Sequence, residues 1–267
     1  MQRRKLAIVF NTVDYCILGI PAYIFCALTG GVITTCVYII LISFKGYNLS
    51  QSMKILGSSV FGMMLGAKIF GFLTGIYRDI GLGKPITMDS LFDTGIVYYG
   101  GLIGLITTYA LCLRINKSLD NNMINILAVC IPLFHSIARI GCFLSGCCYG
   151  KVYEGILSVK YTTMIGEYAD INMRFPVQIV EGIFEFSIFI YLYVLLKKEE
   201  RQINTLLLRY LSLYSIGRFL LEFLRGDYRR GIICGISFSQ VISILVWVVL
   251  IVYYLKLYKF SKLEGEL

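Results

Sequence analysis

Seven apolar stretches run along the chain and constrain its fold more than any other feature. A run of about 20 apolar residues forms a helix long enough to cross the ~30 Å hydrocarbon core of a bilayer. The composition fits this class, because 57% of the 267 residues are hydrophobic and only 15% are charged. The sequence therefore predicts an all-α integral membrane protein with seven transmembrane helices, at approximately residues 15–42, 55–76, 92–113, 123–143, 179–196, 206–223 and 238–257.

The segments between these helices are short and polar, except for residues 151–176, which could form a small lobe outside the bilayer. The sequence contains no repeat and no sign of a second domain, so we expect residues 1–267 to form a single membrane domain. Its start, MQRRKLAIVF, resembles a signal sequence. We expect it to be retained, because Asn11 and Asp14 interrupt the apolar run and no small-residue cleavage site follows.

The net charge of +9 lies mostly in the loops and at the chain ends. This placement indicates attraction to lipid headgroups rather than binding to nucleic acid. Lys and Arg nearly balance between alternate loops, so the positive-inside rule does not orient the protein. Seven helices place the two chain ends on opposite sides of the membrane. We expect a monomer.

An arginine within the predicted fourth helix gives the first indication of a functional site. An ionised Arg139 at membrane depth costs several kcal/mol, which favours a role in binding a partner or an anionic ligand. His135, Arg139 and Cys142 are separated by four and then three residues, so they lie on one face of the helix. We expect this face to point toward the interior of the bundle.

The predicted sixth helix carries a similar stripe of polar side chains. Tyr214, Arg218, Glu222 and Arg225 recur at intervals of four, four and three residues. Arg139 and Arg218 approach the same leaflet from different helices, so together they could clamp a phosphate group.

The carboxylates near these arginines allow two interpretations. Glu181 and Glu222 could hold the guanidinium planes in position for phosphate binding. Alternatively, Glu181, Glu185 and Glu222 could form an internal salt-bridge network that only fastens the helices.

The alternation of seven helices predicts where the polar groups gather. The starts of the third, fifth and seventh helices and the ends of the fourth and sixth lie on one side of the membrane, whichever way the protein faces. Polar groups stand at those ends, at residues 98–101 and 139–150, at Gln178 with Glu181, at residues 214–227, and at Ser239 with Gln240. The sequence therefore predicts one site at one membrane face.

Five segments in this part of the chain resemble the prolipoprotein diacylglyceryl transferase family, over about residues 93–245. RIGCFLSGCCYG is similar to the family signature RIGNFINGELYG, and YYGGLIG is similar to HGGLIG. FPVQIVE resembles HPSQLYE, YSIGRFLLEFLRGD resembles YGxxRFxxEFxRxPD, and SFSQVIS resembles MGQxLS. In three of these segments the matching positions are Arg139, Gly141, Phe143, Gly146, Tyr149, Gly150, Pro176, Gln178, Glu181, Tyr214, Arg218, Phe219, Glu222, Phe223, Arg225 and Asp227.

The resemblance implies an enzyme of the bacterial cytoplasmic membrane. It would move the diacylglyceryl group of phosphatidylglycerol onto the thiol of a lipobox cysteine in a secreted precursor protein, and release glycerol phosphate. The resemblance also implies that the active site faces the outer leaflet, with the amino end and an extracytoplasmic lobe outside. We expect no metal or cofactor, because a phosphomonoester leaves readily as an anion.

The motifs and the resemblance together suggest roles for the site residues. Arg139 and Arg218 would bind the headgroup phosphate and stabilise its developing charge, while Glu181, Glu222 and Gln178 would orient them. Glycines would let the lipid approach the backbone closely, with helix packing as the alternative for the YYGGLIG pair; they are Gly100, Gly101, Gly141 and Gly146. The remaining substrate-binding positions are Cys142, Cys147, Gly150, Tyr214 and Arg225.

The chain departs from the family pattern at the residue expected to activate the thiol. The family's histidine before GGLIG is Tyr99 here, and a phenol with a pKa of about 10 is a poorer base at neutral pH than an imidazole of about 6.5. His135, the only histidine, could take this role, or it could simply bond a neighbouring helix. We therefore expect Tyr99 or His135 to assist the acceptor.

The signature segment also carries cysteines where the family has other residues. Cys142 with Cys147 or Cys148 could form a disulfide, the three together with His135 could bind a metal, or one thiol could carry the lipid covalently. Two other functions therefore stay open. One is a relative that uses phosphatidylglycerol with another acceptor, such as a glycan or a peptide, and the other is a non-catalytic membrane protein that binds lipid or metal.

Overall fold

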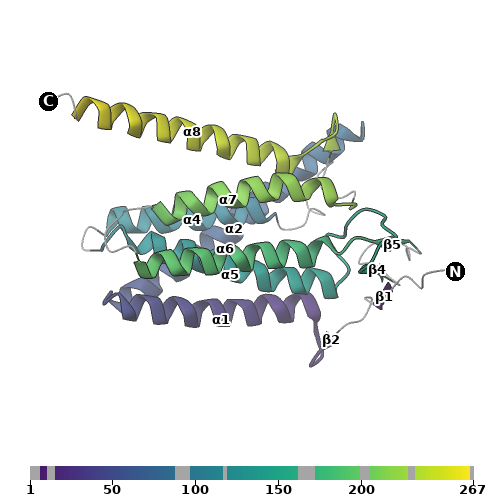
Figure 1. Cartoon of the computed structure of the whole chain (residues 1–267), viewed down its shortest axis with the longest axis horizontal. Coiled ribbons are helices and arrows are strands. Elements are labelled where there is room, and N and C mark those ends of the chain that lie inside the picture. The colour runs from purple at the N-terminus through teal and green to yellow at the C-terminus, as the bar shows by residue number, and fades with distance from the viewer. Residues whose placement is uncertain are drawn as a thin grey trace.

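The computed structural model of the chain describes residues 7–10, 16–87, 97–116, 119–161, 172–198, 205–227 and 232–264. The predicted start of the third helix and residues 162–171 of the predicted lobe lie outside this set. Within it, seven long helices run side by side along the long axis of the molecule (Figure 1). They are α1 Ala22–Phe44, α2 Leu49–Gly81, α4 Tyr98–Ile115, α5 Met123–Leu144, α6 Val177–Lys198, α7 Thr205–Leu221 and α8 Phe238–Glu264.

Six of the described helices are long and apolar enough to cross a membrane. The exception is α7, which has 17 residues and carries Arg209 and Arg218. A short 3₁₀ helix, η1 (Glu222–Leu224), extends α7 at its C-terminal end. The all-α integral membrane class predicted from the sequence is therefore confirmed at the level of six candidate spans.

Helix α5 is the centre of the bundle and packs against α1, α6 and α7. In its most apolar window 72% of the residues are buried, whereas the other five candidate spans have only 17–33% of theirs buried. A helix that other helices enclose over most of its surface can hold polar side chains away from lipid, so α5 is a suitable place for a buried site. The outer helices expose apolar side chains such as Ile33, Leu65 and Val249, as a lipid-facing surface requires.

A small β-structure caps one end of the bundle (Figure 1). Strand β4 (Ser158–Tyr161) pairs in parallel with β1 (Ala7–Phe10), in the register Ala7 to Ser158, and antiparallel with β5 (Met173–Arg174). The order in this sheet is β1-β4-β5. The apolar run that follows the charged start of the chain is therefore a strand that joins the predicted lobe.

The first helix begins later than predicted. Strands β2 (Cys16–Ile17) and β3 (Ile20–Pro21) form a hairpin, and α1 starts at Ala22. Leu18 and Gly19 turn the hairpin with φ of 55° and 77°, the left-handed conformation that a tight two-residue turn needs. Pro21 then opens the helix, because proline has no N–H to donate within one. A second hairpin, β6 (Ile232–Ile233) with β7 (Ile236–Ser237), precedes α8 in the same way.

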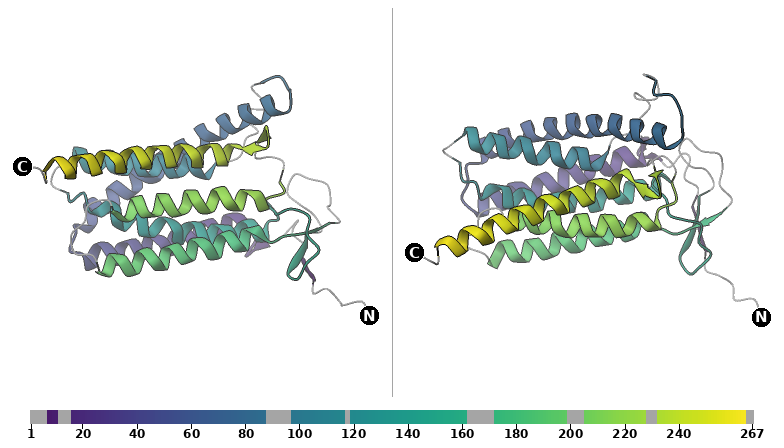
Figure 2. Two further views of the ribbon diagram at one scale, coloured as in Figure 1. Left: turned by 45° about the horizontal axis from the view of Figure 1, so that its top comes forward. Right: turned by 90° about the horizontal axis from the view of Figure 1, so that it is seen from above.

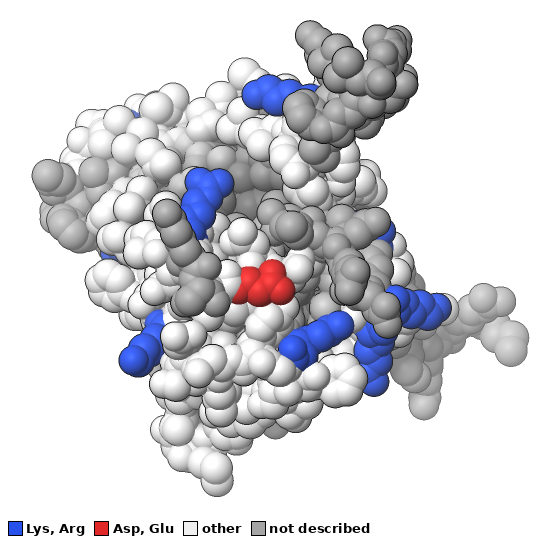
Figure 3. All heavy atoms as spheres, turned by 90° about the vertical axis from the view of Figure 1, so that its left-hand side faces the viewer, with Lys and Arg blue, Asp and Glu red and all other residues white. Residues whose placement is uncertain are grey.

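The predicted gathering of helix ends is confirmed. The starts of α4, α6 and α8 lie with the ends of α5 and α7 at the end of the bundle that carries the β-structure (Figure 2). Strand β1 lies at this end as well, and the C-terminal end of α8 lies at the other (Figure 1). The opposite end exposes Lys and Arg side chains around a small acidic patch (Figure 3). Exposed cations of this kind suit contact with anionic headgroups.

Candidate active site

Helical spacing of four residues builds the polar centre of the bundle. Each of three neighbouring helices turns a pair of ionisable side chains inward at this spacing, and all of these side chains are buried. The pairs are His135 with Arg139 on α5, Glu181 with Glu185 on α6, and Arg218 with Glu222 from α7 into η1.

The two arginines meet at one carboxylate. The Nε atom of Arg139 lies 2.8 Å from Oε2 of Glu181, and Nη1 of Arg218 lies 2.5 Å from Oε1 of the same residue. Arg218 also reaches Glu222, with 2.6 Å between Nη2 and Oε2. The predicted convergence of Arg139 and Arg218 is therefore observed, and the carboxylate that joins them belongs to the salt-bridge network that the sequence also allowed.

His135 is held from both sides. Arg139 donates its Nε–H to Nε2 of His135 over 3.0 Å, and Nδ1 lies 3.2 Å from Oε1 of Glu185. An imidazole nitrogen that accepts a hydrogen bond carries no proton, so the ring proton of a neutral His135 is on Nδ1, facing Glu185. The ring also stacks on Tyr98, with centroids 3.7 Å apart.

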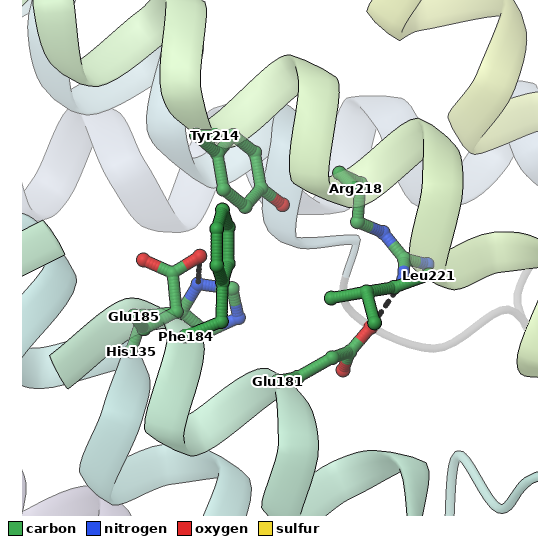
Figure 4. A pocket seen from close by; sticks show the side chains of 7 residues that line it. All are labelled: His135, Glu181, Phe184, Glu185, Tyr214, Arg218 and Leu221. Atoms are coloured by element: carbon green, nitrogen blue, oxygen red, sulfur yellow. Dashed lines mark hydrogen bonds and ion pairs between the residues drawn. The ribbon is translucent and has the colours of Figure 1, made fainter. Parts of the chain in front are cut away.

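A small pocket opens between these groups (Figure 4). Its empty volume is about 180 Å³, and its walls come from α5, α6 and α7. The hydroxyl group of Tyr214 borders it, is buried, and has no hydrogen-bond partner among the described residues. A buried donor left unpaired in a cavity is what a polar ligand would satisfy. The pocket is lined by His135, Glu181, Phe184, Glu185, Tyr214, Arg218 and Leu221.

Tyr99 does not line this pocket. Its hydroxyl group shares a 2.6 Å hydrogen bond with Oγ of Ser243 on α8. Its ring lies edge-on to Tyr214, with centroids 5.2 Å apart. Of the two residues expected to assist the acceptor, His135 is therefore the one beside the arginines.

Two further predicted positions have different partners from those expected. Gln178 donates its Nε2 hydrogens to the carbonyl of Cys147 at 2.8 Å and to the Tyr161 hydroxyl at 3.1 Å, so it ties the turn after α5 to the β-structure rather than orienting the arginines. Arg225 forms a bidentate pair with Asp227, with distances of 2.8 and 2.6 Å. This pair fixes Arg225 at the end of the bundle.

The glycines expected to admit the lipid instead pack against protein. A side chain at Gly100 would overlap the carbonyl oxygen of Gly66 on α2, and one at Gly101 would lie 3.3 Å from Met63 on the same helix. At Gly141 it would lie 2.9 Å from Cβ of Cys26 on α1.

The other two predicted glycines, Gly146 and Gly150, lie in the turn and the segment that follow α5. Gly150 is covered by the carbonyl oxygen of Phe175. Gly146 has a φ of 64° and ends α5. At Gly100, Gly101 and Gly141 the close approach is therefore between helices, which favours the packing alternative for the YYGGLIG pair, and a lipid-binding role for these glycines stays a prediction.

The end of α5 is a Schellman turn that gathers three cysteines. The Gly146 N–H bonds the carbonyl of Phe143 at 3.2 Å, and the Cys147 N–H bonds that of Cys142 at 3.1 Å. The second bond folds Cys147 back over Cys142. Cys148 follows with a φ of 56°, which is unusual for a residue other than glycine. The Sγ atoms of Cys142, Cys147 and Cys148 all lie within 4.8 Å of one another, and all three thiols are free.

The electrostatics of this turn favour a thiolate at Cys148. Hydrogen bonds from the thiols of Cys142 and Cys147 lower the pKa of Cys148 well below its ordinary value. Burial opposes this shift, and the cations of Arg225 and Arg139 add to it. Among the described residues, these three thiols are the group able to hold a metal ion.

Comparison with known proteins identifies the family. The model of the family described as prolipoprotein diacylglyceryl transferase matches residues 12–256. The chain belongs to the prolipoprotein diacylglyceryl transferase family. A phosphatidylglycerol–prolipoprotein diacylglyceryl transferase of Clostridium tetani is 32% identical over 206 residues, which are 77% of this chain and 80% of that protein. The second such transferase of Clostridium perfringens is 31% identical over 222 residues, 83% of each chain.

The pocket is lined by Arg218 and by the unpaired hydroxyl of Tyr214, and Arg139 is joined to Arg218 through Glu181. The imidazole of His135, which also lines it, is backed by the carboxylate of Glu185. The sequence indicates Glu185 only as a salt-bridge partner and does not single out Ser243. The spacing of four residues from Glu181 is the available signal for Glu185, whereas nothing in the sequence connects Ser243 to Tyr99, 144 residues away.

Proposed function

We propose that the protein moves the diacylglyceryl group of phosphatidylglycerol onto the cysteine thiol of a prolipoprotein. The names of its relatives from Clostridium tetani and Clostridium perfringens state this donor and this acceptor. The observation that carries the proposal is the meeting of Arg139 and Arg218 at Glu181, beside a pocket with a free donor at Tyr214. These groups offer the charge and the hydrogen bonds that a phosphodiester needs.

The chemistry requires one bond to form and one to break. The sulfur of the acceptor thiol attacks the glycerol carbon that bears the phosphate, a C–S bond forms, and the C–O bond breaks. Its electron pair leaves with the phosphate oxygen as glycerol phosphate. Arg139 and Arg218 would stabilise that developing charge in a site shielded from water, where oriented cations are most effective. Arg139 and Arg218 are each only 6% exposed, which supports such shielding.

His135 would accept the proton of the thiol. Its Nε2 is bonded to Arg139 in the resting arrangement, so it becomes available when the arginine turns toward a phosphate. Glu185 would hold the imidazole from the other side and stabilise its protonated form. In this scheme the arrival of the lipid headgroup releases the base, which couples donor binding to activation of the acceptor.

The pocket is small and would leave the acyl chains of a bound lipid outside. Its empty volume is about 180 Å³ even when space open to solvent is counted, so it does not enclose a whole lipid. A lipid bound there would keep its chains among the lipid-facing helices. The donor would therefore stay in its leaflet throughout the reaction.

We further propose that all seven helices cross the membrane and that the chain is one domain. At 1.5 Å per residue the 17 residues of α7 extend roughly 25 Å, and η1 adds about 6 Å, which together match the ~30 Å hydrocarbon core. The end with the β-structure and the active site would face the outer leaflet of the bacterial cytoplasmic membrane, as a secreted acceptor requires. The protein would act as a monomer.

Incubation of the purified protein with labelled phosphatidylglycerol and a lipobox peptide tests donor and acceptor together. We expect diacylglyceryl peptide and glycerol phosphate in equal amounts. A peptide in which the lipobox cysteine is replaced by serine is the matched control and should stay unlabelled. Release of glycerol phosphate without labelled peptide would indicate a different acceptor. Absence of both products would contradict the proposal.

A further inference from the structure

The three cysteines at the end of α5 form a cluster that the proposed reaction does not use. Cys142 is buried, whereas Cys147 and Cys148 are partly exposed, so the cluster is enclosed on one side and open on the other. All three are free thiols with their Sγ atoms within 4.8 Å of one another. Thiols at this separation from three positions of one turn can reach a common ion.

The distances agree with those that a soft metal ion requires. Zinc binds cysteine sulfur at about 2.3 Å, so two sulfurs on one tetrahedral ion lie roughly 3.8 Å apart. The Sγ atoms of the cluster are at most 4.8 Å apart, so side-chain movements of about 1 Å or less would bring them to this separation. Thiolate ligands select soft cations such as Zn²⁺ and Cu⁺ over Mg²⁺ or Ca²⁺.

The backbone holds the three thiols together before any ion arrives. The Schellman hydrogen bond from the Cys147 N–H to the Cys142 carbonyl fixes the first two. Cys148 has a φ of 56°, a conformation that costs a residue with a side chain about 1–2 kcal/mol. Strained positions of this kind persist where the surrounding structure enforces them, and they are common at ligand sites.

The cluster leaves one coordination position to be filled. A tetrahedral ion of the zinc class takes four ligands, and the three thiols supply three of them. The partly exposed side leaves a fourth coordination position for water or another exogenous ligand.

We infer that Cys142, Cys147 and Cys148 form a binding site for one thiophilic divalent cation of the zinc class, with three protein ligands and an open fourth position. This inference is independent of the proposed transferase activity, because none of the three thiols lines the pocket beside the arginines. It assigns the cysteines of the signature segment a role in place of the disulfide or the lipid carrier that the sequence also allowed.

Titration of the full-length reduced protein with CdCl₂ tests the site, because cadmium bound to thiolates gives a charge-transfer absorption in the ultraviolet. We expect saturation at one ion per chain. Competition between the protein and a chromophoric chelator for ZnSO₄ then gives the zinc affinity. Loss of an outer-shell partner alone costs metal sites about 10- to 100-fold in affinity, so replacement of a ligand should cost at least as much.

Cys148→Gly is the most informative variant, because glycine adopts the φ of 56° without strain and the turn should therefore fold at least as well. We expect it to lose the charge-transfer band, as should Cys142→Ser and Cys147→Ser. Cys234→Ser, at an exposed cysteine in the β6–β7 turn, is the matched control and should bind normally. Cadmium binding that survives in Cys148→Gly, or no binding by the reduced protein, would overturn the inference. A disulfide between two of the three cysteines that persists in the isolated protein would overturn it as well.

Discussion

Arg139 donates a hydrogen bond from Nε to Nε2 of His135 over 3.0 Å, and this bond determines which nitrogen of the ring is protonated. Together with Glu185 at Nδ1 it makes the imidazole, rather than the phenol of Tyr99, the group prepared to accept a proton. His135→Gln should lower turnover by about 10²- to 10⁴-fold, the usual contribution of a general base. Tyr99→Phe should leave turnover within about twofold, because the Tyr99 hydroxyl bonds only Ser243 among the described residues.

Turnover of labelled phosphatidylglycerol at saturating lipid, together with lipid binding measured separately, distinguishes the two variants. His135→Gln should still bind the lipid. If Tyr99→Phe proved inactive while His135→Gln remained active, the assignment of the base would be reversed.

Tyr214→Phe should weaken binding of phosphatidylglycerol without lowering the stability of the protein. The hydroxyl is buried and unpaired among the described residues, so its removal leaves no protein partner unsatisfied and should change the melting temperature little. If the hydroxyl binds the headgroup phosphate, its loss should raise KM for phosphatidylglycerol by roughly tenfold, the effect of one hydrogen bond to a charged group. Tyr210→Phe is the control, because that hydroxyl shares a 2.9 Å hydrogen bond with Tyr98 and lies outside the pocket lining. An unchanged KM in Tyr214→Phe would remove this residue from the binding site.

Arg139→Ala and Arg218→Ala should each reduce turnover by at least about 10²-fold, as loss of one charged donor to a developing anion does. Each variant also leaves Glu181 with one cation instead of two, which should destabilise the protein by about 3–5 kcal/mol. Arg218→Lys retains the charge and helps to separate the two effects, since it should recover stability more fully than turnover. Arg114→Ala, at an exposed position near the end of α4, controls for loss of a surface cation. Full activity in either alanine variant would disprove phosphate binding by the pair.

Gly100→Ala tests whether this glycine serves helix packing. Its new methyl group would overlap the Gly66 carbonyl on α2, so the variant should lose about 1–3 kcal/mol of stability. Gly57→Ala, in α2, is the control, because nothing lies within 4 Å of the position that its new methyl group would take and alanine favours a helix. Thermal unfolding in detergent measures both. A stable Gly100→Ala protein with a raised KM would instead support contact with the lipid.

The site was easier to predict from the sequence than its surroundings. Arg139, Arg218 and Glu181 could be recognised because ionisable side chains are costly in an apolar helix and therefore conspicuous. Helical spacing then placed Tyr214 and Glu222 with them, and the alternation of helices predicted that they would meet at one end of the bundle. The structure confirms that gathering.

The contacts that the sequence did not predict depend on which face of each helix packs against which neighbouring helix. Membrane helices are apolar on both their lipid-facing and their protein-facing sides, so periodicity carries little information about orientation. For that reason the sequence did not reveal that Gly100 faces α2, or that Gln178 bonds the Cys147 carbonyl. The start of α1 was misplaced for a local reason, since the hairpin before Ala22 is as apolar as the helix that follows it.

At the proposed phosphate site, Glu181 would compete with the lipid headgroup for the two arginines. Because one of its oxygens accepts a hydrogen bond from Arg218 and the other lies 2.8 Å from Nε of Arg139, a headgroup at the proposed site would gain only the difference between its own contacts and those of the carboxylate. After the proposed reaction the same exchange would run in reverse, and the carboxylate would displace the departing product. Slow release of a tightly held anion would otherwise leave the enzyme inhibited by its own product, and the shared carboxylate would counteract that inhibition.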